Sequence, residues 1–332
     1  MNSLLPQNWL TLPPSNLAAL APIQELHWPK INSQGIKLSI RRDDLIDPIM
    51  GGNKIYKLHG HLNHYLKQHN NNHANKNVEH PPVASFGGAY SNHLYALAGA
   101  CQQQNIPFIA IIRGEKPQNL SPTLTDIVRM GATLHFISRS EYRQKDHIHY
   151  LMQLEKEIGS CYWIPEGGGG QNALLGCYAL GESLAQSNAT AIIHACGTGA
   201  SLAGIINGVA GYNQDHPTTQ INTAHVIGIS ALKSNASIVR NILSLAHPVA
   251  LNKVNWRVSN QFHLGGYAKK TNQLEGFIQH AKNQLSVTLD PVYTAKALWA
   301  IEQLCEQKYW CEGSHVMFVH SGGVQGARKS TD

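Results

Sequence analysis

Charged residues are scarce in this chain: they make up 14% of its 332 residues, whereas hydrophobic residues make up 42%. The formal net charge is +6, but the basic residues are scattered, and no run of about five Lys or Arg residues occurs. A nucleic-acid surface needs such a cluster, so we expect no nucleic-acid partner. The sequence also lacks an apolar run of about 18 residues, so we expect no membrane span. A secretory signal is missing as well, which favours a compact cytoplasmic protein.

CxxC pairs and metal-ligand spacings of cysteine are also absent, so we expect reduced thiols rather than a disulfide framework. The six cysteines are Cys101, Cys161, Cys177, Cys196, Cys305 and Cys311. Histidine, by contrast, is locally abundant, at His59, His61, His64, His69, His73 and His80. Most of these histidines fall on the polar face of a predicted helix or in a polar surface loop at 68–82. Because no carboxylate or cysteine accompanies them, we expect no metal site.

The segment Gly51-Gly52-Asn53-Lys54 precedes a run of apolar residues with helical spacing from Ile55 onward. Asn53 is a good N-cap, and the glycines allow a sharp turn before it, so Lys54 falls in the first helical turn. The helix dipole makes this a poor place for a cation. The ammonium form of Lys54 is therefore disfavoured, and its neutral amine becomes available as a nucleophile or base. From these residues alone, an exposed lysine after a glycine turn is the simpler interpretation.

Short apolar strands alternate with helical patterns along the chain. Strands are predicted at 37–41, 83–86, 107–112, 133–137, 161–164, 191–196, 224–230 and 315–319. Helices are predicted from Lys54 onward, after Ser91, at 124–130, 172–185 and 200–209, and after the cap Asp290-Pro291. Continuous apolar strands that alternate with helices indicate an α/β fold with parallel sheets covered on both faces.

Glycine-rich turns follow several predicted strands, where open α/β sheets bind ligands. They are Gly87-Gly88, Gly167 to Gly170, Gly197-Thr198-Gly199 and Gly322-Gly323. One such turn is often only a tight connection, but four indicate that several backbone segments converge on a ligand.

The turn from Cys196 to Ser201 is the best predicted anion site, because a strand leads through small residues into a helix start. A dinucleotide site fits poorly: the third glycine of the motif is replaced by Leu202, and the next strand ends without an acidic residue. A GxxxxGK[ST] motif is also missing. A single-phosphate cradle remains, and together with a reactive lysine it is what pyridoxal phosphate requires.

The chain resembles the pyridoxal-phosphate enzymes related to 1-aminocyclopropane-1-carboxylate (ACC) deaminase and D-cysteine desulfhydrase, of the tryptophan synthase β fold type (fold type II). The matching motifs are Arg42-Asp43-Asp44-Leu45, Gly52-Asn53-Lys54 with Lys57-Leu58, Ser91-Asn92-His93, Pro165-Glu166-Gly167-Gly168, 197–201, Gly265-Gly266-Tyr267, Asp290-Pro291-Val292-Tyr293-Thr294 and His320-Ser321-Gly322-Gly323. The resemblance implies two open, mainly parallel α/β/α domains with the cofactor in a cleft between them. The larger domain would comprise 1–57 plus 165–332, and 58–164 would be a smaller inserted domain. We also expect a homodimer.

The resemblance further implies roles for individual residues. The cofactor-binding residues would be Lys54, Asn92, Gly197, Thr198, Gly199, Ala200, Ser201, Thr294 and Ser321. The substrate-binding residues would be Ser91, His93, Tyr267 and Tyr293, and the catalytic ones Lys54, Tyr293 and Ser91. In this scheme Lys54 carries the cofactor covalently, residues 197–201 hold its phosphate, and Asn92 contacts its ring hydroxyl. Ser91 and His93 lie by the substrate carboxylate.

The chain departs from the family pattern around this centre. Tyr56 and Tyr95 stand where arginine is common, and Tyr90 stands where glutamine is usual. These changes leave the substrate open and favour, as one alternative, a catalytically idle phosphate- or pyridoxal-phosphate-binding protein. The chain also ends soon after Gly326, which leaves open whether its C-terminus is complete.

Two positions bear on the reaction. In the ACC deaminase branch a glutamate and a leucine occupy the positions of Thr294 and Ser321. A carboxylate beside the pyridine nitrogen keeps it protonated, whereas a hydroxyl does not. We therefore expect a lyase that catalyses α,β-elimination from a small amino acid, D-cysteine first, giving pyruvate, ammonia and sulfide. ACC deamination, or deamination of another D-amino acid, is the alternative.

Overall fold

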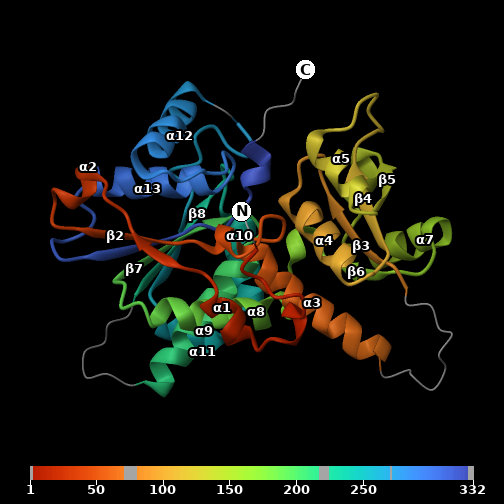
Figure 1. The fold of residues 1–332 in the computed structure, drawn as a ribbon, viewed down its shortest axis with the longest axis horizontal. Helices are drawn as coiled ribbons and strands as arrows, with labels where there is room; N and C mark the ends of the chain where they lie inside the picture. Colours follow the sequence, from red (N-terminus) through yellow and green to blue (C-terminus); the bar gives the residue numbers. More distant parts are fainter. Residues whose placement is uncertain (1–2, 71–80, 217–223, 270, 328–332) are drawn as a thin grey trace.

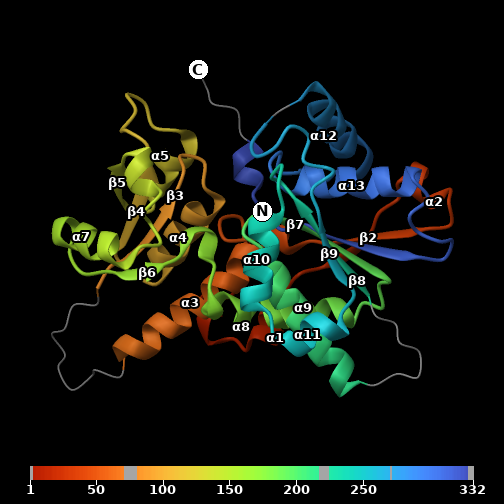
Figure 2. The same cartoon turned by 180° about the vertical axis from the view of Figure 1, so that it is seen from behind.

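The computed structural model describes residues 3–70, 81–216, 224–269 and 271–327. Most of the predicted loop at 68–82, including His73 and His80, lies outside these residues. The chain forms two open sheets that lie side by side, each covered by helices (Figures 1 and 2). The predicted α/β class with mainly parallel sheets is confirmed.

The larger sheet has six strands in the order β1-β2-β10-β7-β8-β9. Their bounds are β1 Ile23–Glu25, β2 Lys37–Arg41, β7 Ala191–Cys196, β8 His225–Ser230, β9 Trp256–Ser259 and β10 His315–Val319. Every pairing is parallel except that of β1 with β2. The sheet therefore joins segments from both ends of the chain.

The smaller sheet has four parallel strands in the order β5-β4-β3-β6. Their bounds are β3 Val83–Gly87, β4 Phe108–Arg113, β5 Thr133–Ile137 and β6 Tyr162–Ile164. All four strands fall inside the segment predicted to be an inserted domain. The domain boundary itself stays a prediction, and helix α3 (Asn53–Asn70) runs unbroken across its proposed start at residue 58.

Helices form layers on both faces of each sheet (Figure 1). The other helices are α1 Pro14–Ala19, α2 Pro29–Asn32, α4 Asn92–Gln103, α5 Pro122–Arg129, α6 Arg139–Tyr142, α7 Ile148–Ile158, α8 Gln171–Ala185, α9 Ala200–Asp215, α10 Ala236–Leu245, α11 Pro248–Lys253, α12 Asn272–Leu285 and α13 Thr294–Glu306, with 3-10 turns η1 Trp9–Thr11, η2 Asp43–Leu45, η3 Glu166–Gly168 and η4 Val324–Ala327. On one face of the larger sheet, α13 packs on the strands, and α2 and α12 pack against α13. On the other face α9 packs on the sheet, and α8 packs against α9. On the smaller sheet α4 packs on β3 and β4.

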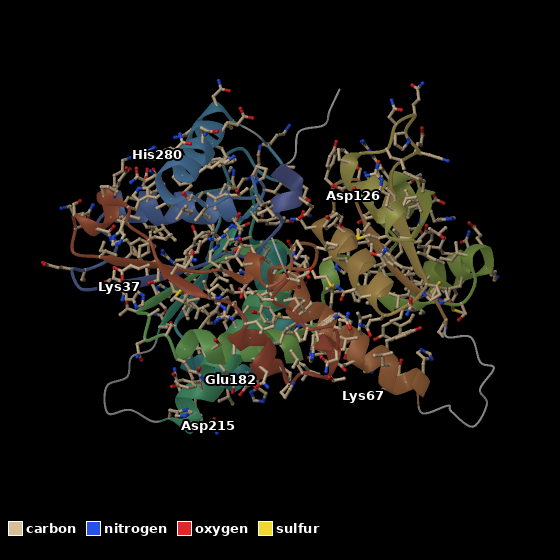
Figure 3. The ribbon with its side chains drawn as sticks, in the orientation of Figure 1. Lys37, Lys67, Asp126, Glu182, Asp215 and His280 are labelled. Atoms are coloured by element: carbon tan, nitrogen blue, oxygen red, sulfur yellow. The ribbon has the colours of Figure 1, made fainter. Side chains whose placement is uncertain are left out.

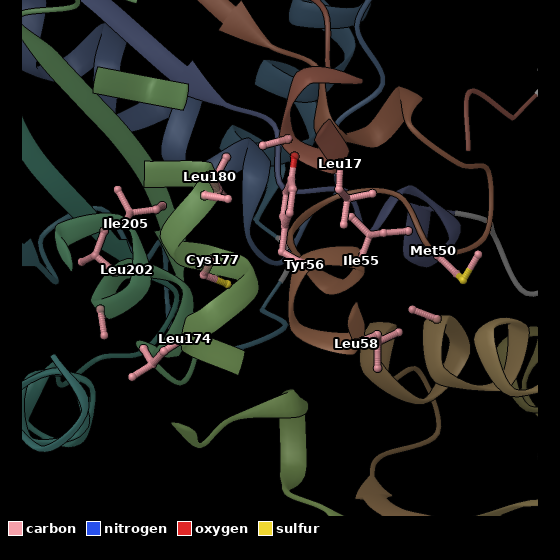
Figure 4. Close-up of a cluster of buried hydrophobic side chains, with 14 of the residues drawn as sticks. Leu17, Met50, Ile55, Tyr56, Leu58, Leu174, Cys177, Leu180, Leu202 and Ile205 are labelled. Atoms are coloured by element: carbon pink, nitrogen blue, oxygen red, sulfur yellow. The ribbon is translucent and has the colours of Figure 1, made fainter. Parts of the chain in front are cut away.

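Helix α3 is held against α8 in a buried apolar cluster that includes Tyr56 of α3 and Cys177 of α8 (Figure 4). The two helices approach so closely that a Cβ atom at Gly176 of α8 would overlap the Tyr56 carbonyl oxygen. Only glycine fits at such a contact. The packing fixes the start of α3, and therefore Lys54, relative to the larger sheet. Labelled charged residues such as Lys67 and Glu182 lie on the periphery (Figure 3).

The apolar pattern predicted strands better than helix ends. Helix α13 begins at Thr294 rather than at Pro291, because Asp290 caps a turn at 291–293 first. Helix α9 continues to Asp215, beyond the predicted end at Val209. The pattern also left out α7, α10, α12 and β9. Within the described residues, no helix combines the length and apolar character needed to cross a membrane.

Candidate active site

A cavity of about 990 Å³ lies where the carboxyl ends of the strands of both sheets meet. Its walls come from the residues that follow β3, β4, β6, β7, β8 and β10 and from the start of α3. Ligands of open α/β sheets bind at this end of parallel strands, so the convergence of glycine turns predicted from the sequence leads to one cavity.

Nearly all of the predicted site residues line this cavity. They are Lys54, Ser91, Asn92, His93, Gly197, Thr198, Gly199, Ser201, Tyr267, Tyr293 and Ser321. Two predicted residues are not among those that line it. Ala200 is buried in the first turn of α9, between the cavity-lining residues Gly199 and Ser201. Thr294 is fully buried, and its hydroxyl accepts a hydrogen bond from the Asp290 backbone amide at 2.7 Å. Thr294 is therefore not among the residues that line the cavity, although it directly follows Tyr293, which is.

Lys54 lies at the start of α3 and is linked through Asn53 to the glycine turn at 197–201. Its Nζ donates to Asn53 Oδ1 at 2.9 Å, and Asn53 Nδ2 donates to Ser201 Oγ at 2.9 Å. The pKa of Lys54 is lowered to about 7, chiefly by burial and secondarily by the Lys57 ammonium. The pKa shift has the expected direction, and burial, which the sequence reasoning did not invoke, is its first cause.

Lys57 is a second cavity-lining lysine, which the sequence reasoning did not single out. It lies one turn after Lys54, is 3% exposed, and donates from Nζ to the Gly167 carbonyl at 3.0 Å. Burial lowers its pKa as well. The spacing of the two lysines on one helical face was the available signal.

Because Lys57 disfavours the ammonium form of Lys54, Lys57→Met should raise the pKa of Lys54 by about one unit. Cofactor attachment to the apoprotein needs the neutral amine, so its pH midpoint should move upward from about 7. The visible absorbance formed after adding cofactor at different pH values measures this midpoint. Lys67→Met, on the exposed far end of the same helix, is the matched control. An unchanged or lower midpoint in Lys57→Met would contradict the proposed coupling.

The turn from Gly197 to Ser201 has the form of an anion cradle. Gly199 is the N-cap of α9 with φ of +87°, and the first turn of this helix holds no acidic residue. The first amides of a helix lack carbonyl partners within it and favour an anion. The small turn, the helix start and the nearby neutral lysine fit a phosphorylated aldehyde such as pyridoxal phosphate.

Gly199→Val should weaken cofactor binding at least about tenfold. A side chain at this φ is strained, and its Cβ would lie 2.9 Å from the Ile238 carbonyl oxygen and 3.1 Å from Ile242 Cγ1. The turn must shift, and its amides with it. Cofactor titration of the apoprotein measures the effect. Gly276→Ala, where an added Cβ meets nothing within 4 Å, is the control. Undiminished affinity in a folded Gly199→Val protein would place the phosphate elsewhere.

The segment Ser91-Asn92-His93 opens α4 at the cavity wall. Ser91 is the N-cap, and its Oγ accepts from the Leu94 amide at 3.2 Å. Asn92 Oδ1 accepts a hydrogen bond from Gln325 Nε2. The His93 Nε2 contacts Ser85 Oγ at 2.8 Å, and burial first, then Lys54 and Lys57, holds the pKa of His93 well below its usual value. His93 is therefore neutral.

Ser91→Ala should raise KM about tenfold if Ser91 also binds the substrate carboxylate, because a hydrogen bond to a charged group is lost. The cofactor absorbance should stay unchanged. Loss of the cap should also lower stability by about 1 kcal/mol. Thr271→Ala separates the two effects, since Thr271 caps α12 with the same 3.2 Å bond to the Leu274 amide. If both variants lose stability and neither changes KM, Ser91 is only a cap.

Two tyrosines form the part of the wall near the larger sheet. The rings of Tyr267 and Tyr293 meet edge to face with centroids 6.2 Å apart. Burial, and then Tyr267, raises the pKa of Tyr293 well above its usual value, so its phenol stays protonated. Tyr267 is half exposed at the mouth, whereas Tyr293 lies deeper.

The tyrosine at position 56 is not on the cavity wall. Its hydroxyl donates to Asp43 Oδ1 at 2.7 Å and accepts from Arg41 Nη2 at 3.1 Å, in a fully buried network. Tyr56 therefore anchors α3 through Arg41 and Asp43. Tyr90, by contrast, is 59% exposed and does line the cavity. The absence of an arginine at position 56 therefore does not favour a catalytically idle protein.

Two further charged residues on the wall were missed by the sequence reasoning. Asp290, interpreted only as a helix cap, presents a buried carboxyl group whose pKa is raised to about 6, chiefly by burial. Arg113, at the end of β4, reaches the cavity with its guanidinium 5.6 Å from the Tyr142 ring centroid. Among the described residues, no group of three or more metal-ligating side chains occurs.

The fold, with its two mainly parallel sheets and the cavity at their carboxyl ends, is that of a fold type II enzyme. A family model described as "Pyridoxal-phosphate dependent enzyme" matches residues 19–322. The chain belongs to the pyridoxal-phosphate-dependent enzymes of the ACC deaminase and D-cysteine desulfhydrase family, and its cofactor is pyridoxal phosphate. The predicted resemblance and cofactor are confirmed.

Several relatives cover nearly the whole chain. A Pyrococcus horikoshii protein provisionally named 1-aminocyclopropane-1-carboxylate deaminase is 28% identical, over 92% of this chain and 90% of its own. The mitochondrial bifunctional D-cysteine desulfhydrase/ACC deaminase of Arabidopsis thaliana is 26% identical, over 96% of this chain and 81% of its own. The crystal structure of an ACC deaminase homologue superposes with a TM-score of 0.70 at 25% identity, covering 92% of this chain and 90% of that one.

Proposed function

We propose that the protein is a lyase that releases sulfide from D-cysteine by α,β-elimination. The observation that carries this proposal is the lack of a carboxylate at positions 294 and 321. The Thr294 hydroxyl is held by the Asp290 backbone, and Ser321 offers only a hydroxyl to the cavity. A neutral partner leaves the cofactor's pyridine nitrogen weakly protonated, which suffices when the substrate already carries a good leaving group.

The residues of the cavity supply binding and proton transfer. Lys54 holds the cofactor covalently, the amides of residues 197–201 hold its phosphate, and Lys57 adds a positive charge nearby. Bound pyridoxal phosphate supplies the electron sink of the reaction. With the substrate bound, the freed Lys54 amine would be the first candidate to remove the Cα proton, because a pKa of about 7 leaves about half of it neutral at neutral pH.

The substrate is oriented from the walls. Ser91 and neutral His93 bind its carboxylate at the start of α4, where anions are favoured, and Tyr267 and Tyr293 enclose its side chain. The electron pair left on Cα after proton removal forms the Cα–Cβ double bond. The Cβ–S bond breaks, and the sulfur leaves as hydrosulfide with the bonding pair. One water molecule is consumed, so D-cysteine and water give pyruvate, ammonia and hydrogen sulfide. A homodimer stays our prediction for the assembly.

ACC deamination is the second candidate. It is favoured by the names of the relatives, one of which carries both activities. Sulfide and 2-oxo acid release from D-cysteine, L-cysteine and ACC separates the candidates. Sulfide with pyruvate from D-cysteine alone supports the proposal, and 2-oxobutyrate from ACC alone overturns it.

A further inference from the structure

Asp290 is a cavity carboxylate that the proposed reaction leaves without a role. It is 1% exposed although it lines the cavity. Its Oδ1 accepts backbone N–H groups of Val292 at 3.0 Å and Tyr293 at 2.5 Å. Its Oδ2 is buried and has no hydrogen-bond partner among the described residues. A buried, unpartnered carboxylate oxygen is costly, so a role beyond capping the turn is expected of it.

The carboxyl group of Asp290 and the amide group of Asn92 lie side by side against Gly323. A Cβ atom at Gly323 would overlap Asn92 Nδ2 and lie 3.2 Å from Asp290 Cγ. A Cβ at Gly326 would lie 3.4 Å from Asp290 Oδ2 and 3.6 Å from Asn92 Oδ1. The glycines after β10 therefore leave room for this pair. The Asn92 amide also favours the ionised form and so lowers the pKa of Asp290, against the larger effect of burial.

Gln325 fixes the direction of the Asn92 amide. Gln325 Nε2 donates to Asn92 Oδ1, so the oxygen of the amide is already occupied. The opposite end of the amide, Nδ2, carries two N–H groups. One can be donated to the Asp290 carboxylate, and the other is left for an acceptor in the cavity.

We propose that Asp290 is a positioning residue that holds the Asn92 amide so that one N–H points at the cofactor's ring hydroxyl oxygen. The inference rests on the proposed placement of Asn92 beside that oxygen. Without the carboxylate, the Asn92 amide is held by Gln325, whose own amide can turn to donate or to accept, so Asn92 could present either a donor or an acceptor to the cofactor. Gly323 and Gly326, the cap at Asp290 and the start of α4 thus act together on the hydrogen bond from Asn92 to the cofactor's ring hydroxyl.

A double-mutant cycle on the apoprotein tests this inference. In Asp290→Asn the side-chain oxygen still caps the turn, but its NH2 group opposes the Asn92 NH2 group. Asp290→Asn and Asn92→Ala should each weaken pyridoxal phosphate binding about tenfold, and the double variant should bind no more weakly than Asn92→Ala alone. Affinity and the position of the visible absorbance band are measured by titration with the cofactor.

The control is Asp47→Asn, because Asp47 makes the same double cap, to the Ile49 and Met50 amides at 2.8 Å, outside the cavity. It should leave the titration unchanged. If Asp290→Asn does not fold, Gln325→Leu tests the other end of the Asn92 amide. It should weaken pyridoxal phosphate binding several-fold in the wild-type background and have no further effect in the Asn92→Ala background.

The outcomes separate the inference from the proposals beneath it. Additive losses in the double variant, or normal affinity in folded Asp290→Asn, would overturn the role of Asp290. Normal affinity in Asn92→Ala would overturn the placement of Asn92 and the inference with it. The double-mutant cycle measures cofactor binding only. If the protein does not release sulfide from D-cysteine, the proposed reaction is wrong, but the result of the cycle still stands.

Discussion

Lys54→Ala should abolish covalent attachment of pyridoxal phosphate and reduce turnover by about three orders of magnitude. The variant loses both the covalent anchor of the cofactor and the amine that takes the Cα proton. The amides of residues 197–201 remain, so the cofactor should still bind, but more weakly and as the free aldehyde. Borohydride reduction of the wild-type protein, followed by peptide mapping, should place the pyridoxyl mass on Lys54.

Two other lysines of α3 serve as controls for this test. Lys67→Ala should keep both the label and the activity, because Lys67 lies at the exposed far end of the helix (Figure 3). Lys57 is the critical competitor, since it is buried in the same cavity one turn away. A pyridoxyl label on Lys57 in the wild-type protein would show that the wrong lysine has been assigned.

The unmodified protein should release sulfide from D-cysteine and leave ACC essentially untouched. Cysteine carries a good leaving group at Cβ, whereas ACC carries none and requires a strained carbon–carbon bond to be opened. The second reaction should need the stronger electron sink that a carboxylate beside the pyridine nitrogen maintains. Thr294→Glu with Ser321→Leu should therefore depress sulfide release and admit ACC turnover. Sulfide, pyruvate and 2-oxobutyrate are the measured products.

The burial of Thr294 requires its own control. A glutamate at this fully buried position must displace the hydrogen bond between the hydroxyl and the Asp290 amide, and it can destabilise the turn. Thr294→Val removes the same hydrogen bond without adding a carboxylate, so comparing the two variants isolates the charge. Rapid ACC deamination by the unmodified protein, with no sulfide from D-cysteine, would mean that these two positions do not set the chemistry.

Most strands were predictable because they are short and mainly apolar and are bounded by glycine, proline or polar residues. Residues 133–137, 191–196 and 315–319 form strands with the predicted bounds. Helix α12 was missed although Leu274, Phe277 and Ala281 have helical spacing and are buried. The start of α13 could not be predicted from the Asp-Pro cap, because the cap serves an intervening turn whose geometry depends on packing at the cavity.

The site was predictable where chemistry follows from local sequence. The lysine after Gly51-Gly52-Asn53 and the strand-turn-helix at 196–201 each carry their signal within a few residues. Asp290 is different, because its surroundings combine Asn92, about 200 positions earlier, with Gly323 after the last strand. The Thr294 side chain raises the same difficulty, because whether a hydroxyl faces a cavity or its own turn depends on contacts that a single sequence does not display.

The position of β10 in the six-stranded sheet constrains how the chain folds during synthesis. β10 is synthesised after β2 and β7, yet it lies between them and hydrogen-bonds to both. Until residues 315–319 emerge, no strand joins the two halves of this sheet. The strands of the smaller sheet are contiguous in the chain and can pair much earlier. The facing edges of β2 and β7 therefore stay open to pairing with other nascent chains until β10 has been synthesised.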